Sequence, residues 1–170
     1  MRAFIALPIP EPSIAALVGL QNTLAHGRAV PEENLHLTLA FLGDVSETVL
    51  DELHFELSRL RSPAPCVQFT GLAVYPATRQ KLIVIEVNDD PHLASFAKQI
   101  TTVARGTGLA LPRRRFRPHV TLTRGRSVPS DLPVFRTPVP QFEATEFCLY
   151  RSTLSEGGAR HEVLAAYSLV

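Results

Sequence analysis

The segment "PEENLHLTLAFLG", from Pro31 to Gly43, places two polar side chains inside an otherwise apolar run. Side chains of a β-strand alternate between its two faces, so His36 and Thr38 share one face while Leu37 and Leu39 take the other. The segment therefore predicts a strand over residues 35–42. Its apolar face enters the core, and its polar face presents an imidazole beside a hydroxyl.

A second segment, "FRPHVTLTRG" from Phe116 to Gly125, repeats this arrangement. His119 and Thr121 share one face of a strand there, opposite Val120 and Leu122. A single strand histidine is more often structural or simply exposed than functional, but recurrence of the same pattern makes coincidence a poor explanation. The two segments predict two similar lobes, each contributing one His-x-Thr strand.

Outward from these strands, the hydrophobic periodicity alternates between strand and helix. Ser46 and Asp90-Pro91 are expected to begin helices, because Ser and Asp favour the N-cap and Pro favours the first turn. Further strands are expected over 1–7, 67–74, 81–87, 119–123, 142–151 and 161–169, helices over 12–26, 46–60 and 90–106, and a proline-rich connection over 128–140. This order predicts an α+β fold with two largely antiparallel sheets and flanking helices, as a single bilobal domain over 1–170.

The bulk composition describes a globular chain of 170 residues, 45% hydrophobic and 19% charged. Its first twelve residues are interrupted by prolines and are too short for a signal or membrane segment, and no other apolar run has membrane-spanning length. Cys66 and Cys148 have no metal-type spacing. We expect both to be buried, reduced thiols in a protein of the reducing cytoplasm.

The positive charge is unevenly distributed, although the net charge is only +1. Six arginines fall within fourteen residues that contain no acidic residue: Arg113, Arg114, Arg115, Arg117, Arg124 and Arg126. One interpretation is a solvated basic loop, and the other is a local patch that attracts phosphate groups. The sequence leaves both open.

Two histidines with two threonines suit proton transfer at a phosphate. Imidazole titrates near neutrality, so one ring can activate water as a base while the other protonates a departing oxygen. Thr38 and Thr121 can donate hydrogen bonds to non-bridging oxygens. Arg124 is the candidate for stabilising the negative charge that develops on them.

Competing chemistries have less support in the sequence. Two histidines are too few for a stable zinc site, and neither segment contains Asp or Glu, so we expect no metal and no cofactor. Walker-type glycine loops and acyl-transfer elbows are absent from the sequence. The other histidines, which are His26, His54, His92 and His161, are expected to be structural or at the surface.

The sequence resembles the two-histidine phosphoesterase superfamily, and within it the RNA 2′,3′-cyclic phosphodiesterases, also named 2′-5′ RNA ligases. The resemblance extends over nearly the whole chain, through "RAFIALPIP", "PEENLHLTLAFLGDV", "FRPHVTLTRG" and "STLSEGGARHEVLAAYSL". It implies two lobes related by a pseudo-two-fold axis, with the two His-x-Thr segments facing each other across a central cleft. It also implies hydrolysis of the terminal 2′,3′-cyclic phosphate of RNA to a 2′-phosphate.

The same resemblance implies that His36 donates a proton to the leaving 3′ oxygen and that His119 activates water, with the roles exchanged in the ligating direction. The sequence departs from common family residues at Ala40 (often lysine), Thr123 (often alanine) and His161 (often tyrosine).

The implied partner is RNA with a 2′,3′-cyclic phosphate end, such as a tRNA fragment, bound by a monomer away from membranes. Its backbone would contact Arg113, Arg114, Arg115 and Arg117. Two alternatives stay open: a phosphodiesterase for small cyclic nucleotides, and a nucleotide-binding module without turnover.

Overall fold

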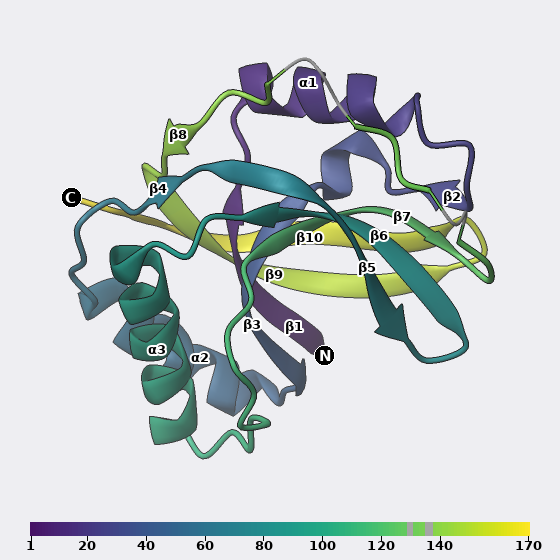
Figure 1. Ribbon diagram of the computed structural model, residues 1–170. Helices are drawn as coiled ribbons and strands as arrows, with labels where there is room; N and C mark the ends of the chain where they lie inside the picture. The colour runs from purple at the N-terminus through teal and green to yellow at the C-terminus, as the bar shows by residue number, and fades with distance from the viewer. Residues whose placement is uncertain (129–130, 135–137) are drawn as a thin grey trace.

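The computed structural model describes residues 1–128, 131–134 and 138–170 of the chain. These residues form an α+β fold in which three α-helices flank antiparallel sheets, as the sequence predicts (Figure 1). The elements are β1 (Arg2–Pro8), α1 (Glu11–Gln21), β2 (Arg28–Ala29), the 3-10 turn η1 (Glu32–Asn34), β3 (His36–Asp44), α2 (Glu47–Arg59), β4 (Cys66–Val67), β5 (Phe69–Ala77), β6 (Gln80–Val87), α3 (Pro91–Gly106), β7 (His119–Gly125), β8 (Phe142–Glu143), β9 (Glu146–Ser155) and β10 (Gly158–Ser168).

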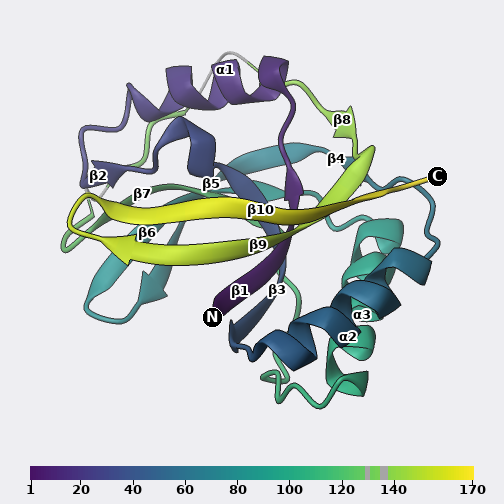
Figure 2. The ribbon, with the colours of Figure 1, turned by 180° about the vertical axis from the view of Figure 1, so that it is seen from behind.

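Two four-stranded sheets carry the architecture. The first has the order β10-β9-β1-β3, and the second has the order β2-β7-β6-β5, with neighbouring strands antiparallel in both. Figure 2 shows the long β9–β10 hairpin crossing the molecule in the view from behind. The strands β3 and β7, which begin at the two candidate histidines, contact each other where the sheets meet.

The two sheets contain the same strand–helix–strand arrangement as a repeated unit. In the first, α1 connects β1 to β3, and in the second, α3 connects β6 to β7, with each strand pair antiparallel. The helices are exchanged between the sheets, because α1 contacts β7 and α3 contacts β3. The apolar residues of both sheets form one continuous core as a result.

Local chemistry explains where the helices begin. The Ser46 hydroxyl accepts a hydrogen bond from the Val49 amide at the start of α2, and the Asp90 carboxylate accepts one from the Leu93 amide at the start of α3. Pro91 occupies the first turn of α3, where its missing amide hydrogen costs nothing. Both predicted helix starts are confirmed.

The segment between α1 and β3 differs from the expectation. The helix ends at Gln21 rather than near residue 26, because the chain turns to lay the short strand β2 beside β7. Gly27 lies in the left-handed region at φ 64°, and a Cβ there would collide with the Arg124 carbonyl. Only glycine permits this approach without strain.

Further expectations need correction or a limit. The strands expected over 67–74 and 142–151 are each divided, the first into β4 and β5 and the second into β8 and β9. Cys148 is buried as predicted, but Cys66 is exposed, because the alternation in β4 turns Val67 inward instead; both thiols are free. The final strand begins at Gly158 rather than His161, since the β9–β10 hairpin pairs up to its turn. The predicted connection over 128–140 lies partly outside the described residues. No helix of the described chain is long and apolar enough to cross a membrane.

Candidate active site

The two His-x-Thr segments lie where the sequence predicts, at the start of β3 and β7. Leu37 and Val120, the residues between each histidine and threonine, are fully buried. The histidines and threonines on the opposite face are half-buried. Each triplet pairs without interruption with its neighbouring strand: His36 to Thr38 are opposite Pro8 to Ala6 on β1, and His119 to Thr121 are opposite Glu86 to Val84 on β6.

Each strand contains a β-bulge directly after its threonine. The register shifts past Leu39 in β3 and past Leu122 in β7. An extra residue in one strand interrupts the alternation of faces. Two consecutive side chains therefore point inward in each strand, Leu39 with Ala40 and Leu122 with Thr123.

The bulge moves the fifth residue after each histidine to the polar face. That residue is Phe41 in β3, which is 68% exposed, and Arg124 in β7, which is also exposed. Strict alternation from His119 would have turned Arg124 toward the core and Thr123 toward the site. Thr123 is instead 1% exposed.

His36 has a fixed orientation. Its Nδ1 lies 2.6 Å from the carbonyl oxygen of Asn34, to which it donates a hydrogen bond, and its Nε2 lies 2.9 Å from Oγ1 of Thr38. Asn34 is buried, and its side-chain amide donates to the Ala159 carbonyl on β10 at 2.7 Å. The turn before β3 is thereby tied to the far strand of the same sheet.

His119 repeats this arrangement. Its Nδ1 donates to the carbonyl oxygen of Arg117, also two residues earlier, at 2.7 Å. With Nδ1 protonated in both neutral rings, Nε2 is the atom available for proton exchange. The aromatic ring of Tyr75 on β5 lies against His119, with ring centroids 4.7 Å apart.

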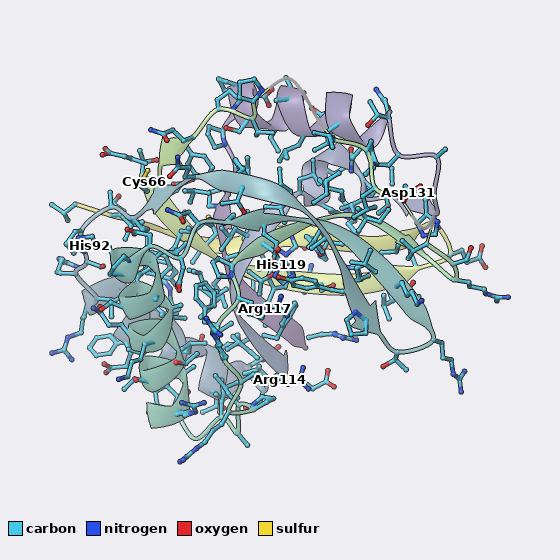
Figure 3. All side chains as sticks on the ribbon, in the orientation of Figure 1. Cys66, His92, Arg114, Arg117, His119 and Asp131 are labelled. Carbon is cyan, nitrogen blue, oxygen red and sulfur yellow. The ribbon has the colours of Figure 1, made fainter. Side chains whose placement is uncertain are left out.

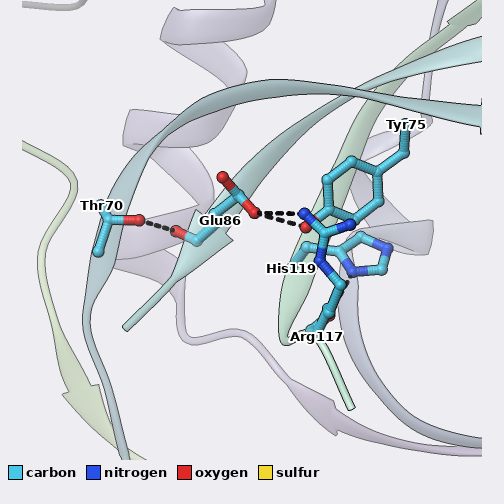
Figure 4. Close-up of polar contacts among 5 residues, drawn as sticks. All are labelled: Thr70, Tyr75, Glu86, Arg117 and His119. Carbon is cyan, nitrogen blue, oxygen red and sulfur yellow. Dashed lines mark hydrogen bonds and ion pairs between the residues drawn. The ribbon is translucent and has the colours of Figure 1, made fainter. Parts of the chain in front are cut away.

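A carboxylate organises the surroundings of His119 (Figure 4). Glu86 on β6 accepts a hydrogen bond from the Tyr75 hydroxyl at 2.5 Å and forms an ion pair with Arg117 at 3.4 Å. The Arg117 guanidinium lies over the Tyr75 ring, 4.4 Å from its centroid. Burial and the contact with Glu86 raise the pKa of Tyr75 to about 12, so its hydroxyl stays protonated.

The environment of His36 disfavours a proton on that ring. Burial lowers its pKa from 6.5 to about 4, and the positive charges of His161, Arg124 and His119 add to the effect. The hydrogen bond to the Asn34 carbonyl opposes it only in part. In the ligand-free protein near neutral pH, His36 is therefore neutral, and its Nε2 accepts from the Thr38 hydroxyl.

Burial also lowers the pKa of His119, and the charges of Arg117 and Arg124 act in the same direction, while Glu86 opposes them. Arg124, on β7, thus acts on both imidazoles. Among the residues that the structure describes, no acidic side chain pairs with its guanidinium.

The predicted basic segment divides into two parts. Arg113, Arg114 and Arg115 are exposed on the loop before β7, and Arg114 lies well away from His119 in Figure 3. Arg117 is held beside His119 instead. Arg115 and Arg117, two of the residues predicted to contact the RNA backbone, line a 390 Å³ pocket together with Glu86 and Phe116.

Three residues of this site, Tyr75, Glu86 and His161, were not predicted to belong to it. Tyr75 and Glu86 lie in a hairpin whose sequence suggests only two strands, and His161 was expected to be structural or at the surface. His161 in fact lies against His36. Only the strand pairing reveals them: Glu86, for example, is opposite His119 in the β6–β7 pair, and the sequence does not give this register.

A metal centre finds no support in the geometry of the described chain. No three His, Cys, Asp or Glu side chains gather there in a way that could hold an ion. The expectation of chemistry without metal stays a prediction.

Comparison with known proteins identifies relatives along the chain. Residues 7–85 match the family model of LigT-like phosphoesterases. The RNA 2′,3′-cyclic phosphodiesterase of Escherichia coli is 31% identical over 176 residues, covering 99% of this chain and 96% of that protein. The protein of the same name from Aeropyrum pernix is 26% identical and covers 89% of this chain and 93% of its own length.

Solved structures agree with this relationship over almost the full length. A crystal structure of a phosphoesterase superposes with a TM-score of 0.87 at 28% identity, covering 99% of this chain and 98% of that one. E. coli LigT in complex with NADP+ gives a TM-score of 0.84 at 28% identity, with 99% and 97% covered. Similarity at this level, with both His-x-Thr segments intact, establishes that this chain belongs to the LigT-like phosphoesterase family.

Proposed function

We propose that this protein is an RNA 2′,3′-cyclic phosphodiesterase, which hydrolyses a terminal cyclic phosphate to a 2′-phosphomonoester. The observation that carries the proposal is the paired geometry of His36 and His119. Each Nδ1 is fixed by a carbonyl two residues earlier, so Nε2 is the nitrogen that each ring can use for proton exchange. The E. coli and A. pernix relatives bear the name of this activity.

In the proposed reaction, Nε2 of His119 accepts a proton from water as the water oxygen attacks phosphorus. The bond from phosphorus to the 3′ oxygen breaks, and Nε2 of His36 donates its proton to that oxygen. One water is consumed, and the product carries a 2′-phosphate and a 3′-hydroxyl. In the reverse, ligating direction the two imidazoles exchange roles.

Thr38, Thr121 and Arg124 stabilise the phosphate in this proposal. Hydrogen-bond donors and a fixed positive charge are most effective when they are already aimed at the oxygens on which charge develops. The Thr38 hydroxyl, which lies 2.9 Å from Nε2 of neutral His36, is released from that ring once Nε2 carries a proton. It can then donate to a phosphate oxygen.

The low pKa of His36 links substrate binding to protonation. A phosphodiester brings a negative charge close to His36 and Arg124. Because an adjacent negative charge favours the protonated form of an imidazole, the bound substrate raises the pKa of His36 from its ligand-free value of about 4. Substrate binding thereby prepares the proton donor.

The wider assignment follows from the same activity. We propose that RNA ends such as tRNA fragments are the substrate and that Arg113, Arg114, Arg115 and Arg117 attract the RNA backbone. The chain acts as one bilobal unit over 1–170, as a monomer in the cytoplasm, and needs no metal or cofactor. Exposed arginines can attract phosphates through charge alone, without base recognition.

A substrate panel tests this proposal. Wild-type protein in chelator would be given short RNAs with 2′,3′-cyclic ends, 2′,3′-cyclic mononucleotides and other cyclic phosphates, and the product ends would be identified. We expect turnover of the 2′,3′-cyclic ends to 2′-phosphates. Turnover confined to small molecules would establish a small-molecule phosphodiesterase, and binding without product would establish a nucleotide-binding module. Either result contradicts the proposal.

A further inference from the structure

His161, on β10, lies beside His36 although three strand steps separate them in the sheet. The two rings meet edge to face, with centroids 5.3 Å apart and planes at 86°. The buried ring of Phe4 supports both of them, with its centroid 4.8 Å from each imidazole. The three aromatic side chains form one surface on the site face of the first sheet.

One ring nitrogen of His161 lacks a hydrogen-bond partner within the described part of the fold. Its Nδ1 is buried and makes no hydrogen bond of normal geometry with the described residues, although the adjacent backbone of Arg160 raises the pKa of the ring to a small extent. Buried polar atoms are almost always paired, and an exception calls for an explanation. His54, by comparison, is satisfied by the Tyr167 hydroxyl at 2.8 Å, as a structural histidine should be.

The charges around His161 attract an anion. Burial and the positive charge of Arg124 both lower the pKa of His161, and His161 in turn lowers the pKa of His36. The titratable and charged groups facing it are His36 from β3 and Arg124 from β7. Arg124 carries a fixed positive charge and His36 and His161 can each gain one, and the described residues provide no carboxylate to pair with His161 or Arg124.

We propose that His161 is a third imidazole of the phosphate site and that it donates a hydrogen bond to a non-bridging oxygen of the bound phosphate. This inference rests on the proposed function, because it assumes that the phosphate lies between the two His-x-Thr strands. His161 transfers no proton in the reaction. It binds the phosphate together with Arg124 and thereby completes the first unit, which has Phe41 where the second has its arginine.

Substitutions at His161 can separate a hydrogen bond from ring packing. His161→Phe keeps an aromatic ring against Phe4 and His36 but has no donor. His161→Tyr and His161→Gln keep a donor with a different shape. His92→Gln, on the exposed first turn of α3, is the matched control.

Inorganic phosphate binding, measured by calorimetry at pH 6, is the first readout because it needs no turnover. We expect His161→Phe to weaken phosphate binding about tenfold, in line with the loss of one hydrogen bond to a charged group. The tyrosine and glutamine variants should stay within about threefold of wild type, and His92→Gln should not differ. Circular dichroism would verify that all four variants are folded.

Steady-state turnover of a 2′,3′-cyclic mononucleotide is the second readout. We expect His161→Phe to have a higher KM than wild type and His161→Tyr to have a KM close to that of wild type. Wild-type phosphate affinity in folded His161→Phe would overturn the inference, as would a change confined to the pH profile, which would make His161 only a modulator of His36. Wild-type protein that neither binds phosphate nor turns over the cyclic ends would instead contradict the proposed function itself.

Discussion

The two strand–helix–strand units of this protein have the same backbone arrangement but different side chains around the histidine. Both have a His-x-Thr strand, a carbonyl that orients the histidine, and a bulge after the threonine. His36 is surrounded by the aromatic rings of Phe4 and Tyr150 and by His161, whereas His119 has the Glu86 carboxylate. Two identical imidazoles would compete equally for a proton. The difference shows how a duplicated scaffold can make one ring bind a proton less readily than the other.

The largest expected effect comes from removing either imidazole. His36→Ala and His119→Ala should each lower kcat about a hundredfold or more, because each removes one proton transfer. The double variant should lose less than the product of the two single losses, since the two rings act as one unit. Single-turnover assays on a 2′,3′-cyclic end would measure this. If circular dichroism shows that a single variant is unfolded, the histidine it lacks has a structural role instead.

The next largest effect is expected at the fifth residue after a histidine, which each bulge turns to the polar face. Arg124→Ala should reduce turnover of a cyclic mononucleotide about a hundredfold, because a fixed positive charge beside the phosphate is lost. Phe41→Ala alters the equivalent position of the other unit and should change this turnover by less than about threefold, since Phe41 brings no charge. Equal losses in both variants would show that the bulges, rather than the guanidinium, determine activity.

The pH profile can distinguish the roles of the two histidines. In the ligand-free protein the proton lies more readily on His119, because the pKa of His36 is about 4 and Glu86 supports a proton on His119. The form that the proposed reaction requires, with His36 protonated and His119 neutral, is then a minority. Glu86→Gln removes that support and lowers the pKa of His119 further. It should therefore move the alkaline limb of the kcat/KM profile to lower pH and increase kcat/KM on its plateau.

Above the alkaline limb, kcat/KM should be the same for Glu86→Gln and wild type, because the proton affinity of His36 alone sets the productive fraction there. Glu52→Gln, exposed on α2, is the control for a lost carboxylate elsewhere. If Glu86→Gln falls below wild type at alkaline pH, His119 is the proton donor and the two roles are reversed. The limbs themselves belong to the coupled pair rather than to either ring.

The smallest effect on chemistry is expected from the exposed arginines. Replacing Arg113, Arg114 and Arg115 together by Gln should weaken RNA binding and flatten its dependence on salt, by about 0.7 in log–log slope for each lost phosphate contact with a single strand. Mononucleotide turnover should barely change. Binding titrations from low to physiological salt would measure the slope. A loss of mononucleotide turnover as large as that of Arg124→Ala would contradict the division between the loop and the site.

Local sequence patterns predicted the features that depend on neighbouring residues. Alternation of polar and apolar residues placed His36, Thr38, His119 and Thr121 on one face of each strand, and cap residues located the starts of α2 and α3. Such patterns do not predict which distant strands pair or in which register. Glu86 meets His119, and His161 meets His36, only because distant strands adopt a particular register.

Arg124 shows a third case, in which the residue was identified without its geometry. The sequence predicts a strand that ends at residue 123, and Arg124 is the penultimate residue of the slightly longer β7. The bulge at Leu122 turns it toward the site. The carbonyl of Leu122 accepts hydrogen bonds from the Val30 amide at 2.8 Å and from the Gln21 side chain at 2.9 Å. One donor is the last residue of α1 and the other lies between α1 and β3, so no pattern within β7 could have revealed the bulge.

These bulges also determine where the gene can lose a codon. Deleting Leu122 would remove the extra residue of β7, and the remaining strand would alternate regularly with Arg124 still on the polar face. Deleting Val120 instead would place His119 and Thr121 on opposite faces, so the paired donors would be lost. The same distinction applies in β3 to Leu39 and Leu37. Among natural homologues, single-residue differences in length within these two strands should therefore concentrate at the bulge and avoid the His-x-Thr triplet.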